Sequence, residues 1–496
     1  MSSPSPWMGL RQRFGIPAAL SGAERVLLRL HLISAALSGV AIGCIHLADA
    51  TLAKTLHGSA LQVTAIHLTV GLSYLGALFW AGAMRGRRKT PFLLAFALIG
   101  RGGLSLIGLW RDPHWFILII GLSWLTEALI VTAQVSIIRR AYRREYRDPL
   151  FGLTISVTTL LRLLTTVALG WLLDWNENLY GLYFGIAGAI GFGGVWMLTR
   201  MEQHLERWAP LPGAPQVRPE RIRGPLPSDP VADSYRPAGQ PGLGPALRSM
   251  RESVTLVFRI LREDHAYRRF QRNFIIYGIA FLGLLPVVPL FLVHDLQLDY
   301  RQIGLAKGLM GQAGMILFPP LVGGWMARNG PVRMCTRAFG FLSLYPLLLL
   351  AAGFTLGTLR LGLVYGAFLA FGAAMAGVSL TWHMSSVHFA REEDPSSYQA
   401  VHTFLTGARA CVAPLLGYFL ITFGSKRLAF IFGAGLLWLA AGLMARMARS
   451  AARAAHAPPR PPAGAGAAQP RTRPVARHEN QERQPGKPNR HFRKQD

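Results

Sequence analysis

Four ionisable side chains lie near the middle of long apolar stretches of the chain. They are Arg101, Glu127, Arg162 and Arg409. A charge at mid-bilayer costs about 2.5–3.5 kcal/mol on insertion scales, so such a residue usually faces the interior of a helix bundle and has a function there. A guanidinium group binds carboxylate, phosphate or sulfate through two parallel hydrogen bonds. These residue types therefore indicate recognition of an anion inside a membrane.

Two of the arginines have polar companions at helical spacing. Residues at i, i+3 or i+4, and i+7 share one face of a helix. Such spacing relates Thr159, Arg162 and Thr166, and again His402, Thr406 and Arg409. We expect the two faces to lie opposite one another and to bind an anionic or zwitterionic solute. The alternative is that each arginine joins neighbouring helices as a structural clamp, because buried ion pairs are often structural.

Glu127 is the one carboxylate among the four groups. It can neutralise Arg101 or Arg162, and no mid-span carboxylate is then left for Arg409. A carboxylate in a desolvated span is a candidate for reversible protonation. We therefore predict that Glu127, with Arg101, forms a proton-coupling site or an ion pair. Asp49, Asp174 and Asp295 fall near the outer ends of spans and are predicted to be end caps or gate residues.

The segments that contain Arg162 and Arg409 are built alike. An aromatic residue, a central arginine and a glycine recur 247 residues apart, at Phe151, Arg162 and Gly170 and then at Tyr398, Arg409 and Gly417. An Asp-Pro pair precedes each segment, at 148–149 and 394–395. Asp can cap a helix start and Pro suits the first turn. An apolar helix with a central arginine that occurs twice indicates a duplicated membrane bundle.

Composition agrees with a membrane protein. The 496 residues are 51% hydrophobic and only 15% charged, with a mean hydropathy of +0.31, whereas a soluble chain usually carries about 25% charged residues. A membrane helix needs about 20 apolar residues. We predict an all-α membrane protein with twelve spans in two pseudo-symmetric six-helix bundles, at 26–48, 60–83, 91–109, 115–138, 150–173 and 179–199, and at 272–293, 302–327, 334–354, 360–382, 398–423 and 427–447.

The segments outside the spans are predicted to be cytoplasmic. Basic residues concentrate in the loops after the second, fourth and eighth spans, and such loops face the cytoplasm. The predicted organisation is a lead at 1–25, bundles at 26–199 and 272–447, a linker at 200–271 and a disordered basic tail at 448–496. An amphipathic helix at about 246–265 lies either on the inner membrane surface or against the bundle floor. The tail is expected to lie near anionic lipids, and no nucleic acid is expected as a partner.

One loop sequence resembles the signature of the Major Facilitator Superfamily of transporters, which carries Gly-x-Leu-Ala-Asp-Arg-x-Gly-Arg-Arg after spans two and eight. The second copy here reads GGWMARNGPVR over 323–333, and a weaker first copy reads AMRGRR over 83–88. Alanine stands at 83 and 327, where the family has Asp, and the fifth span lacks the proline of drug antiporters. The resemblance implies alternating access, with cytoplasmic gate loops at Gly86, Arg87, Arg88, Arg328, Gly330 and Arg333.

The sequence thus predicts a secondary transporter of a small solute in the inner membrane, with both termini cytoplasmic. The chain contains no phosphate-binding glycine loop, zinc pattern or nucleophile elbow, so no enzyme activity, cofactor or metal is expected. Expected partners are the solute, coupled protons and anionic lipids, and a monomer is expected. The alternative is a non-transporting relative, an assembly factor or sensor that kept the bundle.

Overall fold

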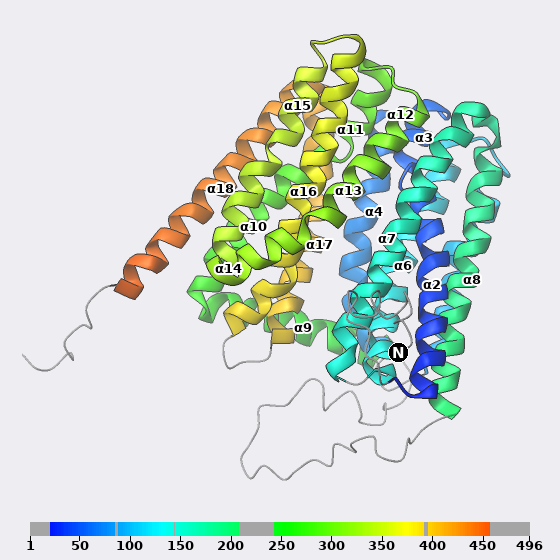
Figure 1. The fold of residues 1–496 in the computed structure, drawn as a ribbon, viewed down its shortest axis with the longest axis vertical. Coiled ribbons are helices and arrows are strands. Elements are labelled where there is room, and N and C mark those ends of the chain that lie inside the picture. Colours follow the sequence, from blue (N-terminus) through cyan, green and yellow to red (C-terminus); the bar gives the residue numbers. More distant parts are fainter. Residues whose placement is uncertain (1–19, 85–87, 143, 208–242, 391–394, 457–496) are drawn as a thin grey trace, which may run out of the picture. The chain divides into compact units, whose positions relative to one another are not determined.

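The structure, a computed structural model, describes residues 20–84, 88–142, 144–207, 243–390 and 395–456. Within these ranges every regular element is a helix (Figure 1). Ten helical segments of the described residues are long and apolar enough to cross a membrane. This confirms an all-α membrane protein. The count of twelve stays a prediction, because Thr90–Leu106 is shorter than a usual span and the segment Leu321–Ala352 contains a backbone break at Gly330.

The first half of the chain forms one group of helices. Its elements are α2 (Gly22–Ile45), α3 (Ala48–Lys54), α4 (Ala60–Ala83), α5 (Thr90–Ala97), η1 (Leu98–Gly102), η2 (Gly103–Leu106), α6 (Pro113–Ala141), α7 (Arg144–Trp175), η3 (Glu177–Leu179) and α8 (Tyr180–Arg207). Helix α2 packs along both α7 and α8, and α4 packs along α6.

The second half follows the helix α9 (Leu243–Glu263). Its elements are α10 (His265–Leu284), α11 (Val287–Leu290), η5 (Phe291–Asp295), α12 (Tyr300–Gly304), η6 (Leu305–Met310), α13 (Gly311–Leu317), α14 (Pro319–Leu342), α15 (Leu344–Ala352), α16 (Gly357–Ala390), α17 (Pro395–Phe423) and α18 (Lys426–His456). We call the end of the bundle with the connections at 55–59, 176–179 and 296–299 the upper end, and the end with α9 the lower end (Figure 1).

Side-chain caps set several helix starts. Ser21 and Glu24 form a reciprocal capping box at the start of α2, as their spacing indicates. Asp112 accepts a hydrogen bond from the Trp115 backbone N–H at 2.8 Å and caps α6. The Asp-Pro pair at 148–149 does not start its helix as predicted, because α7 already begins at Arg144 and Pro149 lies inside it. Helix α17 begins at Pro395, and residue 394 lies outside the described residues.

Three wide, π-helical turns occur among the described residues, at η1, η5 and η6. The first contains Arg101 and the last contains Lys307. π-Helical turns are rare and occur frequently at functional sites. Arg101 and Lys307 therefore lie where the regular helical ladder is interrupted, a feature that hydropathy alone does not reveal.

The buried apolar side chains form two separate clusters. One lies within the lower part of the first half and includes Leu27, Phe96 and Ile137. The other joins the upper part of the first half to the second half, so that Leu47 and Leu52 belong to the same cluster as Leu292, and it continues to Val257 on α9 at the lower end. The halves therefore share an apolar core at the upper end, while the lower part of the first half has a core of its own.

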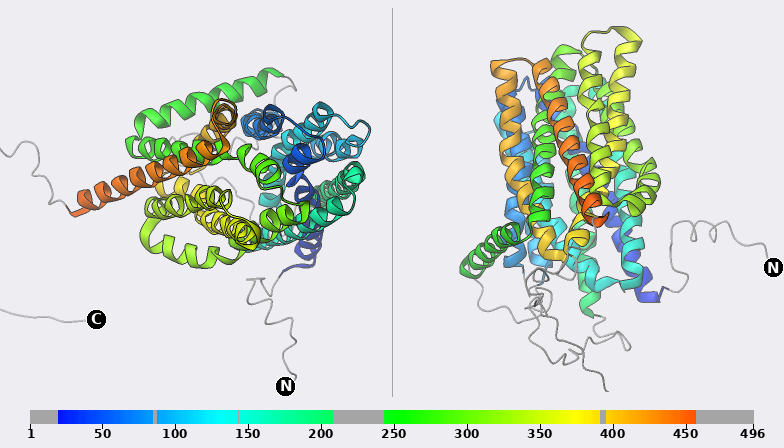
Figure 2. Two further views of the ribbon diagram at one scale, coloured as in Figure 1. Left: turned by 90° about the horizontal axis from the view of Figure 1, so that it is seen from above. Right: turned by 90° about the vertical axis from the view of Figure 1, so that its left-hand side faces the viewer.

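Helix α9 crosses the lower end at an angle to the spans (Figure 2). It contacts α4 of the first half and α10 and α17 of the second. Val257 and Ile260 are buried, whereas Arg251, Arg259 and Arg262 are exposed. Helix α9 therefore packs against α4, α10 and α17, and its position relative to the membrane surface stays a prediction.

A buried carboxylate joins three helices at the lower end of the first half. Glu202, on α8, accepts hydrogen bonds from the Lys89 backbone N–H at 2.9 Å, from Thr90 Oγ1 at 2.7 Å and from Arg140 Nη2 at 2.9 Å. Its side chain is only 1% exposed. Glu202 therefore fixes the start of α5 and the end of α6 to α8, a role that the sequence did not reveal.

We expect Glu202→Ala to destabilise the protein strongly, because it leaves Arg140 and two further donors without their acceptor. Removing one partner of a buried pair costs about 3–5 kcal/mol, which thermal unfolding in detergent would detect as a large fall in Tm. The matched control is Glu206→Ala on the same helix. Glu206 pairs with the exposed Arg88 at 3.3 Å, and exposed pairs contribute about 0–1 kcal/mol. Equal losses in the two variants would contradict this assignment.

Candidate functional site

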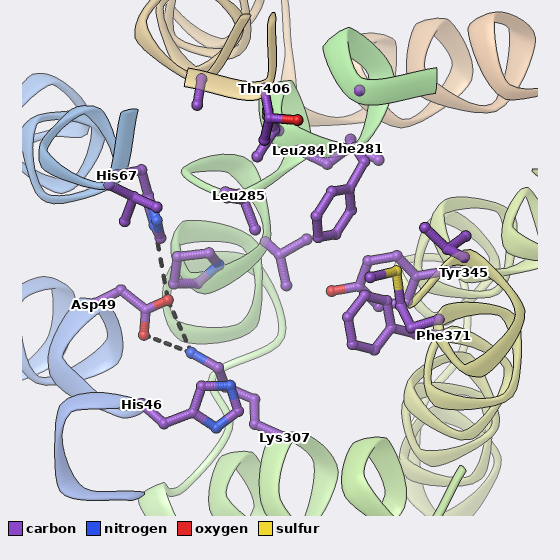
Figure 3. A pocket seen from close by; sticks show the side chains of 18 of the residues that line it. His46, Asp49, His67, Phe281, Leu284, Leu285, Lys307, Tyr345, Phe371 and Thr406 are labelled. Atoms are coloured by element: carbon purple, nitrogen blue, oxygen red, sulfur yellow. Dashed lines mark hydrogen bonds and ion pairs between the residues drawn. The ribbon is translucent and has the colours of Figure 1, made fainter. Parts of the chain in front are cut away.

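A cavity of about 540 Å³ is lined by residues of both halves (Figure 3). Small-molecule sites typically have volumes of about 300–1,000 Å³. The wall is mostly apolar and rich in aromatic side chains, which are Tyr74, Trp124, Phe274, Tyr277, Phe281, Tyr345, Phe368, Phe371 and Trp382. Charged side chains stand at two places on it, at Arg409 and at the pair Asp49 and Lys307. The cavity therefore suits a small organic solute with an apolar body and a charged group.

Arg409 presents a positive charge that no carboxylate balances among the described residues. It is 8% exposed, and its Nη1 donates to the Phe274 carbonyl at 3.0 Å while Nη2 donates to Thr406 Oγ1 at 3.1 Å. The guanidinium carbon lies 5.1 Å from the ring centre of Phe274 and 5.9 Å from that of Tyr277. Nε has no hydrogen-bond partner. Neutral acceptors and aromatic faces hold the group, and its charge remains available to a solute.

Gly278 on α10 makes room for this guanidinium. A Cβ atom at position 278 would lie 2.3 Å from Arg409 Nε and 2.6 Å from Cζ, closer than any real contact. A side chain here would push the arginine out of its slot. Gly278 is therefore a positioning residue for Arg409.

The companions predicted for Arg409 divide between two environments. Thr406 lines the cavity and its hydroxyl donates to the His402 carbonyl at 2.8 Å. His402 is fully buried, and its Nδ1 lies 2.9 Å from the Gln271 side-chain nitrogen. Its ring packs edge-on against Phe274 and does not line the cavity. His402 thus supports the cavity wall from behind.

The structure does not bring Arg162 to the cavity beside Arg409. Arg162 Nη2 donates to Gln312 Oε1 on α13, and neither residue lines the cavity. Thr166 is fully buried and donates to the Gly43 carbonyl at 2.9 Å, while Thr159 is half-buried. Sequence spacing shows which residues share one face of a helix. The packing of the neighbouring helices decides which way that face points. Here α7 presents this face to α2 and α13.

Glu127 pairs with Arg101, one of its two predicted partners. Arg101 Nη2 contacts Glu127 Oε2, and the side chains are 2% and 20% exposed. Both residues belong to the first half, and neither lines the cavity. Any relative movement of the two halves leaves this pair intact.

A second charged cluster connects the halves and was missed by the sequence reasoning. Lys307 Nζ lies 2.6 Å from Asp49 Oδ1 and 2.8 Å from Oδ2, and His67 Nε2 lies 3.8 Å from Asp49 Oδ2. His46 lines the cavity beside them (Figure 3). Lys307 is the sixth residue of the predicted span 302–327, too close to the end of the span for a rule that selects charges near mid-span. Asp49 was expected to be an end cap or gate residue.

The upper end is sealed by polar contacts between the halves. Asp174 accepts hydrogen bonds from the backbone N–H groups of Tyr300 at 2.8 Å and Arg301 at 2.7 Å. The hydroxyls of Thr55 and Tyr300 form a hydrogen bond. A Cβ atom at Gly170 would lie 2.6 Å from the Tyr300 carbonyl, so α7 approaches α12 as closely as backbones allow. The cavity is closed on this side.

The predicted gate loops are described in part. Arg88 pairs with Glu206 at 3.3 Å. Arg328 Nε donates to the Gly324 carbonyl at 3.2 Å, and Arg333 is exposed. Gly330 has φ +79°, a left-handed conformation that favours glycine. Residues 86 and 87 lie outside the described residues.

Comparisons with known proteins agree with this architecture. The sequence profile of the Major Facilitator Superfamily matches residues 32–412. No curated protein sequence matches the chain. Solved structures with the same fold include a variant of the nucleoside transporter NupG (14% identity, 85% of this chain and 99% of that one, TM-score 0.61). A second is a bacterial homologue of the human lysosomal transporter Spinster, inward-facing and unoccupied (14% identity, 88% of this chain and 99% of that one, TM-score 0.56). A third is the human organic anion transporter MFSD10 (15% identity, 86% of this chain and 100% of that one, TM-score 0.51).

We expect Asp174→Asn to loosen the upper end, because an amide offers one acceptor oxygen where the carboxylate serves two N–H groups. Spin labels would be attached to L109C and L356C, at exposed positions of the two halves. In D174N, a larger fraction of molecules than in the unmodified protein should show a long distance between the two labels. The background carries Cys411→Ala, since Cys44 and Cys335 are buried. The control is Glu177→Gln, because Glu177 accepts from Thr55 at 3.0 Å within the first half. An unchanged distance distribution in D174N would refute the sealing role.

Proposed function

Because the chain belongs to the Major Facilitator Superfamily, we propose that it is a secondary active transporter that moves a small organic anion or zwitterion by alternating access. The protein is a multi-pass membrane protein. A cavity lined by both halves and closed at one end is what alternating access requires, since substrate sites of such transporters lie near the midplane at the interface of the repeats. The solved structures with this fold are transporters of nucleosides and organic anions, among others.

The observation that carries the proposal is the unbalanced guanidinium of Arg409 on the cavity wall. Desolvating a charge without a partner costs several kcal/mol, and a carboxylate, phosphate or sulfate on the solute would restore the missing counter-charge through charge-assisted hydrogen bonds. The aromatic wall formed by Phe274, Tyr277 and their neighbours favours an apolar or aromatic solute body. Gly278 keeps the guanidinium recessed so that the solute has room.

Other predicted site residues receive supporting roles. Arg162 joins the halves through Gln312, the clamp that the sequence left open. Thr406 holds the guanidinium from the cavity side, and His402 supports the wall. Arg101 and Glu127 stabilise the first half.

The proposed orientation places the upper end outside the cell and the lower end in the cytoplasm of a bacterial-type inner membrane. The basic residues Arg328 and Arg333 lie within α14 on either side of the backbone break at Gly330, and a concentration of basic residues between spans favours a cytoplasmic position. The structure then represents an inward-facing state, because its upper end is sealed. The exposed arginines of α9 would face anionic lipid headgroups, and the transporter is proposed to act as a monomer.

We expect Arg409→Gln to weaken binding of aromatic carboxylates by about 10–100-fold, the loss of a charged hydrogen bond worth about 1.5–3 kcal/mol. Binding of benzoate, phenylacetate and indole-3-acetate to the purified protein would be measured by thermal shift, each against its neutral amide. The matched control is Arg162→Gln, whose guanidinium does not line the cavity, and its affinities should stay within about twofold of wild type.

Two outcomes would overturn the anion site at Arg409. In one, no carboxylate raises Tm more than its amide. In the other, R162Q loses as much affinity for carboxylates as R409Q. That result would instead support the anion site between Arg162 and Arg409 that the sequence predicted. Uptake of a bound probe into proteoliposomes then separates a transporter from a non-transporting relative, which binds and does not accumulate solute.

A further inference from the structure

Among the described residues, Asp49 and Lys307 form the ion pair that joins the two halves at the wall of the cavity. Asp49 lies on α3 and Lys307 on η6, and each side chain is 11% exposed. The two distances of 2.6 and 2.8 Å show that the ammonium group bridges both carboxylate oxygens. Figure 3 shows the lysine reaching across to the aspartate. The pair can exist only while the upper ends of the two halves are together.

The remaining titratable and charged groups around Asp49 come from four elements. His67 on α4 is 3.8 Å away, and His46 at the end of α2 and Tyr345 on α15 line the cavity nearby. Arg162 on α7 acts on His46 through its charge. Asp49 is thus the one carboxylate of the group, and His67 is the nearest second base.

Separation of the upper ends changes the partners of Asp49. His67 belongs to the same half and stays beside Asp49, whereas Lys307 leaves with the other half. A buried carboxylate that has lost its counter-charge is costly by several kcal/mol. Protonation removes that cost, either on the carboxylate itself or on His67, whose imidazolium can then pair with Asp49.

We propose that Asp49 and His67 form the proton-binding site of the transport cycle, with Lys307 as the competing cation. This inference rests on the proposed function as a transporter. When the upper end opens, one proton enters from that side and occupies the Asp49–His67 pair, while Lys307 stays protonated and meets water. When the upper end closes, the Lys307 ammonium group replaces the proton, which leaves into the cavity. Each cycle therefore carries one proton from the upper to the lower side.

The same reasoning favours Asp49 over Glu127 as the coupling carboxylate. Glu127 keeps Arg101 as its partner whichever way the halves move, because both lie in the first half. Its protonation would not depend on which end is open. Asp49 changes partner at the step that changes access, which is what coupling requires.

The test measures the opening of the upper end against pH and needs no solute. Spin labels on L109C and L356C in the C411A background report the open and closed populations of the full-length protein in nanodiscs. In otherwise unmodified protein the ratio of open to closed should rise as pH falls, by at most about tenfold per pH unit, the limit for one proton. A ratio that does not change with pH would overturn the proposal.

Variants assign the response to the cluster. D49N and K307Q should both favour the open state. In D49N the ratio of open to closed molecules should stay constant within about twofold as pH is varied, because the substitution removes the proton acceptor. H67Q should keep the ion pair and move the midpoint of the response to lower pH. E127Q should respond as the unmodified protein does, with thermal unfolding confirming that it is folded. A wild-type pH response in D49N would refute the assignment.

The experiment separates this proposal from the anion site. R409Q should lose carboxylate binding and keep the pH response, because Arg409 does not contact Asp49, Lys307 or His67. Carboxylates could fail to bind even though the unmodified protein responds to pH and D49N does not. In that case only the proposed substrate class is wrong. If carboxylates bind and the response is absent, only the proton site is wrong.

Discussion

Each charge inside this bundle is stable only where a partner compensates it, and the position of the partner determines what the charge can do. Arg101 pairs with Glu127 inside one half and holds that half together. Lys307 pairs with Asp49 across the halves and exists only in one arrangement of them. Arg409 has neutral acceptors and aromatic faces but no carboxylate. We propose that the three cations serve architecture, conformational change and recognition, respectively.

The packing of small residues decides which end of the bundle is closed. At the upper end the Gly170 backbone touches the Tyr300 carbonyl, and one apolar cluster runs through both halves. Asp174 adds two hydrogen bonds to the start of α12. The lower part of the first half has its own core, fixed by Glu202. The lower part of the first half therefore keeps an interior that does not depend on contacts with the second half.

The cavity lies where these two features meet. One charged cluster stands beside the upper seal, and Arg409 stands on the second half among aromatic side chains. A solute that carries an anionic group and an apolar body satisfies the guanidinium and the aromatic wall together. The Asp49–Lys307 pair lies next to the upper seal and lines the same cavity. In the proposed mechanism, the groups for solute recognition and for proton coupling are therefore different residues that line one cavity.

The sequence by itself determined the class of protein and the candidate charges. Apolar runs long enough to span a bilayer, the repeat around Arg162 and Arg409, and the loop at 323–333 were sufficient to indicate the family, because these signals are local. It also identified Arg409 with Thr406, which one helix holds together. Only the tertiary structure decided that Arg162 faces Gln312, that Glu127 pairs with Arg101, and that Lys307 reaches Asp49. These contacts join residues far apart in the chain, and the rotation of each helix about its axis, set by close packing at positions such as Gly43 and Gly170, decides which of them meet.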